Sequence, residues 1–110
     1  MKAELASKKC VPCDGDTPPL NGEELRRMAA QLDGNWKVIG EERLEKQFKF
    51  PDFRQALHFT NRIGVVAEQQ GHHPDIYLTY GEVRVQLWTH RVSGLTESDF
   101  ILAAKIDDLD

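Results

Sequence analysis

The chain has 110 residues, a length typical of one domain around a single hydrophobic core. Hydrophobic residues make up 40% and charged residues 29%, which excludes a disordered or fibrous chain. The formal net charge is -4 and no long basic run occurs, so direct nucleic-acid binding is not expected. Because no apolar stretch suits a signal peptide or a membrane span, we expect a cytoplasmic protein with no membrane partner.

Residues 1–20 are predicted to form a flexible N-terminal arm, and residues 21–110 a single folded domain. The arm contains both cysteines of the chain, Cys10 and Cys13, in the sequence CVPC. This spacing occurs in zinc sites and redox pairs, but structural zinc needs four ligands and the chain has no second pair. A turn-rich stretch rather than a helix follows the pair, so we interpret the two residues as reduced thiols.

A short amphipathic helix is expected first, in the sequence NGEELRRMAAQL, with Asn21 as N-cap and Glu24 completing a capping box. Two half-buried strands follow, at residues 36–39 and 43–50, joined by a hairpin turn around Gly40. The stretch from Phe53 to Gln70 has a strong helical period and is predicted to be the long central helix.

The predicted central helix has a start signal at Asp52 with Gln55, and it should end at Gly71 because glycine readily caps a helix C-terminus. A second hairpin is expected next, with strands DIYLTY and VRVQLWTH and a turn at residues 81–82. Alternation in its second strand places two sets of side chains on opposite faces: Val83, Val85, Leu87 and Thr89 on one, and Arg84, Gln86, Trp88 and His90 on the other.

The last helix is expected after Thr96, with Asp99 as the N3 partner of that cap. The predicted order is therefore helix-strand-strand-helix-strand-strand-helix, with short connections throughout. Two hairpins with alternating faces indicate an α+β fold, in which a four-stranded antiparallel sheet has three helices packed on one face. One edge of such a sheet is free for self-association.

Three of the four histidines, His72, His73 and His90, are expected near the end of the central helix or of the last strand. Imidazole titrates near neutral pH, so such a cluster can both give and take protons. Two adjacent histidines in an extended loop point apart, and Pro74 restricts the backbone of the second. The fourth histidine, His58, lies beside core positions of the central helix and is assigned a structural place.

Two carboxylates complete the candidate site. Glu68 lies in the last turn of the central helix, where the helix dipole disfavours a negative charge by roughly 0.3–1 kcal/mol. Asp99 follows His90 closely in the chain and is placed to orient an imidazole, although capping already gives it a structural task. Solvent-exposed histidines are one alternative, and a zinc site is a weaker one because HH lacks the i, i+4 spacing of two ligands on a helix. The residues alone indicate a histidine acid/base site.

The polar residues recur at a specific spacing: Glu68, then His72, His73 and Pro74, then Tyr80, His90 and Asp99. This pattern closely resembles the signature of the pterin-4a-carbinolamine dehydratase family. The similarity runs from about residue 20 to the C-terminus and includes the stretches FKFPDFRQAL and THRVSGLTESD.

The resemblance implies a lyase that dehydrates 4a-hydroxytetrahydropterin to quinonoid dihydropterin during tetrahydropterin recycling. It implies no metal or organic cofactor, a homodimer or homotetramer, and a pathway shared with aromatic amino acid hydroxylases. His72 and His90 would then be the acid/base pair, with their two roles unassigned. The implied catalytic residues are His72, His73, His90, Glu68 and Asp99, and the implied substrate-binding residues are His72, His73, Pro74, Thr89 and His90.

The chain departs from the animal members of this family at Gly71, Trp88 and Arg91, which leaves the preferred pterin side chain open. Animal members also resemble a dimerisation cofactor for a homeodomain transcription factor. A non-catalytic protein-binding module that acts as a transcriptional coactivator is therefore the alternative function.

Overall fold

The computed structural model describes residues 2–10, 18–32 and 35–109 of the chain. From the second helix onward, the elements follow the predicted order helix-strand-strand-helix-strand-strand-helix. Within the described ranges, no helix is long and apolar enough to cross a membrane. The elements are α1 (Lys2–Ser7), α2 (Gly22–Ala29), β1 (Lys37–Ile39), β2 (Arg43–Lys49), α3 (Phe53–Gln70), β3 (Asp75–Thr79), β4 (Glu82–Leu87), the 3-10 helix η1 (His90–Val92) and α4 (Glu97–Asp107).

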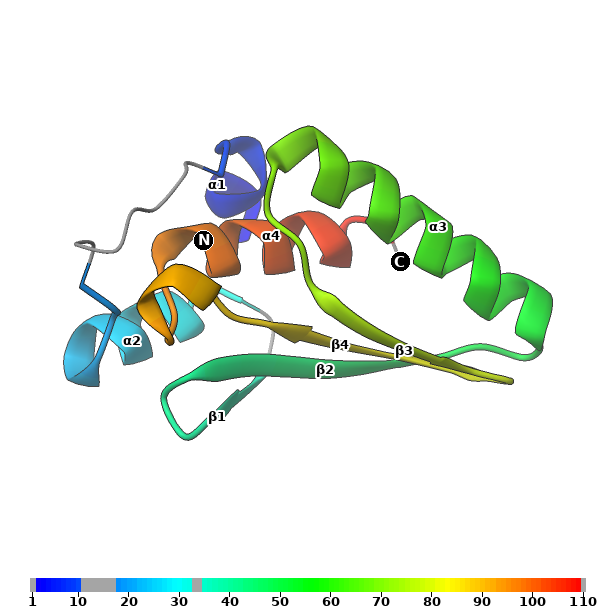
Figure 1. Cartoon of the computed structure of the whole chain (residues 1–110), viewed down its shortest axis with the longest axis horizontal. Helices are drawn as coiled ribbons and strands as arrows, with labels where there is room; N and C mark the ends of the chain where they lie inside the picture. The colour runs from blue at the N-terminus through cyan, green and yellow to red at the C-terminus, as the bar shows by residue number, and fades with distance from the viewer. Residues whose placement is uncertain (1, 11–17, 33–34, 110) are drawn as a thin grey trace.

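The four strands form one antiparallel sheet in the order β1-β2-β4-β3 (Figure 1). The two predicted hairpins are joined through β2 and β4, where Phe48 lies opposite Val83. At the first hairpin, Gly40 and Glu41 both have φ 60°, and Glu42 N–H donates to the Ile39 carbonyl at 3.0 Å. Positive φ at both central residues matches the right-handed twist of the flanking strands. The α+β prediction is confirmed.

The predicted boundaries of the central helix are confirmed. The Asp52 carboxylate accepts a hydrogen bond from the backbone N–H of Gln55 at 2.9 Å, which satisfies one free donor of the first turn of α3. The helix ends at Gly71, whose φ of 64° lies in the left-handed region that favours glycine. The capping box predicted for α2 is wrong, because the Asn21 side chain makes no capping bond; Gly22 N–H instead donates to Glu41 at 3.3 Å.

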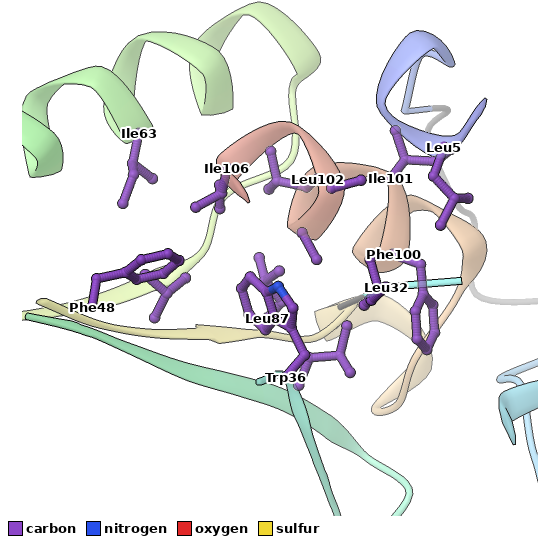
Figure 2. Packing of buried hydrophobic residues seen from close by; sticks show 14 of the residues in the cluster. Leu5, Leu32, Trp36, Phe48, Ile63, Leu87, Phe100, Ile101, Leu102 and Ile106 are labelled. Carbon is purple, nitrogen blue, oxygen red and sulfur yellow. The ribbon is translucent and has the colours of Figure 1, made fainter. Parts of the chain in front are cut away.

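Helix α4 lies at the centre of the molecule, between the sheet and helices α1 and α3 (Figure 1). Its residues 98–104 are all buried. Ile106 lies near Phe48 of the sheet and Ile63 of α3, and the three side chains belong to one hydrophobic core (Figure 2). Because this stretch is buried throughout, the N-terminus of α4 is a fixed platform on which a site can be built.

No helix is predicted from the sequence of the N-terminal arm, but residues 2–7 form α1, which packs on α4. Leu5 is 1% exposed and lies beside Ile101 (Figure 2). The Lys105 ammonium donates to the Ala6 carbonyl at 2.6 Å. A helix of this length is not stable alone, so tertiary packing holds it in place, a signal that local sequence patterns lack. Cys13 lies outside the described residues, and the interpretation of CVPC as reduced thiols stays a prediction.

One charged side chain, Lys46, lies on the buried face of β2 between Leu44 and Phe48. Its ammonium is 2.6 Å from Oδ1 of Asp107, and the Trp36 indole N–H donates to Oδ2 of the same carboxylate at 2.9 Å. The side chains of Lys46 and Asp107 are 8% and 2% exposed. This buried ion pair joins the sheet to the C-terminal end of α4.

Candidate active site

The C-terminal end of α3, the segment after β4 and the N-terminal end of α4 meet at one end of the sheet (Figure 1). Gly71 turns the chain at the end of α3, and the backbone N–H of His72 donates to the Ala67 carbonyl at 3.3 Å. Pro74 then holds the chain extended as it enters β3. The adjacent histidines therefore lie on a short loop that is fixed at both ends.

His72 points inward to Asp99 of α4, and the ring atom Nε2 lies 2.6 Å from Oδ1 of the carboxylate. The side chain of Asp99 is fully buried, whereas that of His72 is 14% exposed. The pair joins the C-terminal end of α3 to the first turn of α4, where the helix dipole favours a negative charge. Asp99 was predicted to orient an imidazole, and the ring that it contacts is that of His72. His90 instead stacks on Trp88.

Asp99 is held by two further donors. Its Oδ2 atom accepts from the Thr89 hydroxyl at 2.7 Å and from the backbone N–H of Thr96 at 3.0 Å. The hydroxyls of Thr89 and Thr96 are 2.9 Å apart. Because the single Thr89 proton goes to Asp99, the Thr96 hydroxyl must be the donor between the two threonines. The predicted capping box of Thr96 and Asp99 is present, and it serves the site as well as the helix.

This network determines which nitrogen of His72 carries the proton. An ionised carboxylate only accepts hydrogen bonds, so Nε2–H of His72 donates to Asp99. In the neutral imidazole the proton is then absent from Nδ1. No described residue bonds Nδ1, which leaves that atom able to accept a proton from a ligand.

His73 has a different partner from His72: its Nε2 atom lies 2.5 Å from Oε2 of Glu68. The side chains are 60% and 78% exposed. An exposed ion pair of this kind adds only about 0–1 kcal/mol to stability, so its geometry matters more for a ligand than for the fold. Each of the adjacent histidines thus has a carboxylate of its own, one buried and one exposed.

β4 ends at Leu87, three residues before His90. His90 is exposed and is the first residue of η1, so the prediction that it stands at the end of the last strand is wrong. A bridge between Thr89 and Gly94 closes the loop that carries it, with Thr89 N–H donating to the Gly94 carbonyl at 2.8 Å. The imidazole stacks on the Trp88 ring with centroids 3.9 Å apart. Because Thr89 contacts Asp99, the residue next to His90 belongs to the His72 network.

Two other polar residues of the sequence analysis lie elsewhere. Tyr80 is 70% exposed in the turn between β3 and β4, at the opposite end of β3 from the histidine loop. His58 is exposed on α3 and lines a separate pocket of about 370 Å³ with Phe50, Arg62 and Leu109. Among the described residues, no three His, Cys, Asp or Glu side chains are grouped so that they could hold a metal ion.

Trp88 and Asp75 are part of this region, and neither is among the site residues predicted from the sequence. The indole N–H of Trp88 donates to Oδ2 of Asp75 at 3.1 Å. The available signal was the alternation in the last strand, which placed Trp88 on the same face as His90.

Fold and site together define a small α+β protein with a buried histidine-carboxylate pair beside two exposed histidines. Residues 18–109 match the model of the family described as pterin 4 alpha carbinolamine dehydratase. The chain belongs to this family, which confirms the resemblance found in the sequence and the prediction of a dehydratase.

Two bacterial relatives named for this dehydratase come from Rubrobacter xylanophilus and Alkaliphilus metalliredigens. The first is 54% identical over 107 residues, which cover 97% of this chain and 99% of the relative. The second is 52% identical over 103 residues, which cover 94% and 93%. Similarity at this level extends over almost the whole chain, so it includes the histidine loop and η1.

Two solved structures have folds similar to that of this chain. A Brucella melitensis protein described as a transcriptional coactivator/pterin dehydratase has a TM-score of 0.77 at 34% identity, covering 83% of this chain and 97% of its own. A pterin dehydratase-like protein described as a RuBisCO assembly factor in the alpha-carboxysome has a TM-score of 0.61 at 26% identity, covering 70% and 90%.

Proposed function

We propose that this chain dehydrates a 4a-hydroxytetrahydropterin to quinonoid dihydropterin, and so takes part in tetrahydropterin recycling. In this reaction the C4a–O bond breaks and the hydroxyl leaves as water after it gains a proton. The N5–H bond breaks as the C=N bond forms, so a base must take one proton while an acid gives one. Side chains that titrate near neutral pH can perform both transfers without a cofactor.

The observation that carries this proposal is the contact between the partly buried His72 and the buried carboxylate of Asp99. Asp99 keeps the proton of the neutral imidazole on Nε2, which makes Nδ1 the basic atom and suits His72 for removing the N5 proton. When His72 becomes positively charged, the buried carboxylate stabilises it. We therefore assign the base to His72 and the acid that protonates the leaving hydroxyl to His90.

The exposed pair of His73 and Glu68 is proposed to bind the pterin and to orient it. A protonated His73 is a donor at both ring nitrogens, and Glu68 fixes one of them. Pro74 keeps this loop extended and is proposed to border the ring of the substrate. The Thr89 hydroxyl is occupied by Asp99, so we propose that Thr89 supports the carboxylate and meets the substrate only through its backbone.

The direct test is to follow decay of the 4a-carbinolamine by ultraviolet absorbance after a hydroxylase generates it. We expect purified protein to accelerate this decay in proportion to its concentration, without added metal. A rate equal to that of the uncatalysed reaction would refute the proposed activity.

A second candidate function is protein binding, because one similar solved structure is described as a coactivator and another as an assembly factor. A binding module does not depend on proton transfer. Replacing His72 should then leave the cellular phenotype unchanged, whereas an enzyme should lose its phenotype with this substitution. Complementation of a strain that lacks its own dehydratase, with the parent and the His72→Ala variant side by side, separates the two functions.

We also propose that the chain forms a homodimer or homotetramer. β1 and β3 are the edge strands of the sheet, and each leaves one row of backbone donors and acceptors unpaired within the described chain. Exposed apolar and aromatic side chains, Ile39 and Tyr77, lie on these two strands. Light scattering should give a mass of two or four times 12.6 kDa, and a monomer mass at micromolar concentration would contradict the proposal.

A further inference from the structure

A second chain of contacts joins the histidine loop to η1, outside the buried network. Asp75 directly follows Pro74 and is the first residue of β3. Its Oδ2 atom accepts from the indole N–H of Trp88 at 3.1 Å. The indole in turn stacks on the imidazole of His90, with centroids 3.9 Å and planes 22° apart. One carboxylate and one indole thus link the two segments that carry the proposed base and the proposed acid.

Strand pairing explains this geometry. Asp75 lies opposite Gln86 of β4, and Trp88 comes two residues after Gln86 on the same face. Diagonal neighbours on one face of an antiparallel pair are within reach of a long aromatic side chain. The Arg43 guanidinium of β2 lies 4.8 Å from the Trp88 ring centroid and confines the indole further. Trp88 is therefore held by contacts from both neighbouring strands.

His90 needs such a restraint more than His72 does. Asp99 holds the ring of His72 through a hydrogen bond. The exposed imidazole of His90 stacks on Trp88 and makes no hydrogen bond or ion pair with any residue that the structure describes. An exposed imidazole without a fixed neighbour samples several rotamers, and an acid must lie within hydrogen-bond reach of its target.

We propose that Trp88, held by Asp75, is a positioning residue that orients His90 for proton transfer. The inference rests on the proposed dehydration, in which His90 is the acid. Trp88 contributes through ring contact alone, and Asp75 contributes only through Trp88.

Tryptophan fluorescence tests the contacts without reference to activity, because a protonated imidazole quenches an indole that it touches. The emission of the parent protein should fall when acidification protonates this imidazole. His90→Gln should abolish this change and His58→Gln should leave it intact. The other tryptophan, Trp36, is buried against Asp107 and provides a constant background.

The same fluorescence titration tests Asp75. Asp75→Asn keeps an oxygen acceptor for the indole N–H and should preserve the quench, whereas Asp75→Ala should reduce its amplitude by about half or more because the indole is released. An unchanged amplitude in Asp75→Ala, or a quench that survives His90→Gln, would overturn the proposal.

Kinetics test the consequence for catalysis. Trp88→Leu should lower kcat about tenfold or more with little change in KM, because misplacement of a catalytic group by about 1 Å is costly. Asp75→Ala should lower kcat less, and Asp75→Asn should restore it. Asp75→Ala should add nothing in the Trp88→Leu background if Asp75 acts only through Trp88.

If Asp75→Ala lowers kcat by the same factor in the Trp88→Leu background as in the parent, then Asp75 has a role of its own, and the proposal is overturned. Inactivity of the parent protein would instead refute the proposed function, and the fluorescence result would still decide whether Asp75 and Trp88 hold His90.

Discussion

Asp99→Asn should lower kcat by a factor on the order of 10² to 10⁴ while the protein stays folded. The amide is isosteric with the carboxylate, and its oxygen can accept from Thr89 and from the Thr96 backbone as Oδ2 does now. Its NH₂ group would then face Nε2 of His72, in place of Oδ1. A donor there requires Nε2 to be an acceptor, so the ring proton moves to Nδ1 and the proposed basic atom is lost.

The measurement is the carbinolamine decay rate with saturating and limiting substrate, with circular dichroism and thermal melting as folding controls. His72→Ala and His90→Ala should lose most activity and keep the fold. His58→Ala is the matched control, since this histidine is exposed on α3 and lines a separate pocket. Equal losses in the three histidine variants would reveal a structural effect, and an Asp99→Asn variant within about threefold of the parent would remove Asp99 from the mechanism.

The elements of this fold could be predicted because their signals are local. Asp52 with Gln55 and the left-handed Gly71 define the two ends of α3 within a few residues of sequence, and the structure shows both. The predicted capping bond of Asn21 is missing although the local pattern is similar. There, Gly22 N–H donates to Glu41 instead, a tertiary contact that sequence spacing does not encode.

The arrangement of the site was less accessible from the sequence. The family pattern indicates that Glu68, His72, His73 and Asp99 belong to the site. It does not indicate which carboxylate pairs with which imidazole. Asp99 is nine residues from His90 and 27 from His72, yet it bonds His72. The partner depends on how the end of α3 lies over the start of α4, which core packing determines. The same holds for α1, whose burial depends on α4.

The buried ion pair of Lys46 and Asp107 is a further case in which sequence separation hides the contact. The two residues are 61 positions apart. Lys46 shares the buried face of β2 with Leu44 and Phe48, so it is an inward-pointing charge. A buried cation needs an anionic partner, and only the fold shows that this partner is Asp107 in the last turn of α4.

Lys46→Met should lower the free energy of unfolding by about 3–5 kcal/mol, because it removes the Lys46 ammonium that lies against the buried Asp107 carboxylate. The methionine fills a similar volume, so the loss reflects charge rather than a cavity. Urea unfolding at one fixed protein concentration measures the change, since association would shift the transition by mass action. The matched control is Lys49→Met, the same substitution on the exposed face of β2, which should stay within about 0.5 kcal/mol of the parent.

Combining Lys46→Met with Asp107→Asn separates the charge from the hydrogen bond. The double variant removes both charges, and the asparagine oxygen can still accept from the Trp36 indole at the present 2.9 Å geometry. Because replacing a whole buried ion pair is often neutral, the double variant should regain at least about half of the stability lost by Lys46→Met alone. If the two substitutions add, or if Lys46→Met equals Lys49→Met, then the Lys46 ammonium does not stabilise the Asp107 carboxylate.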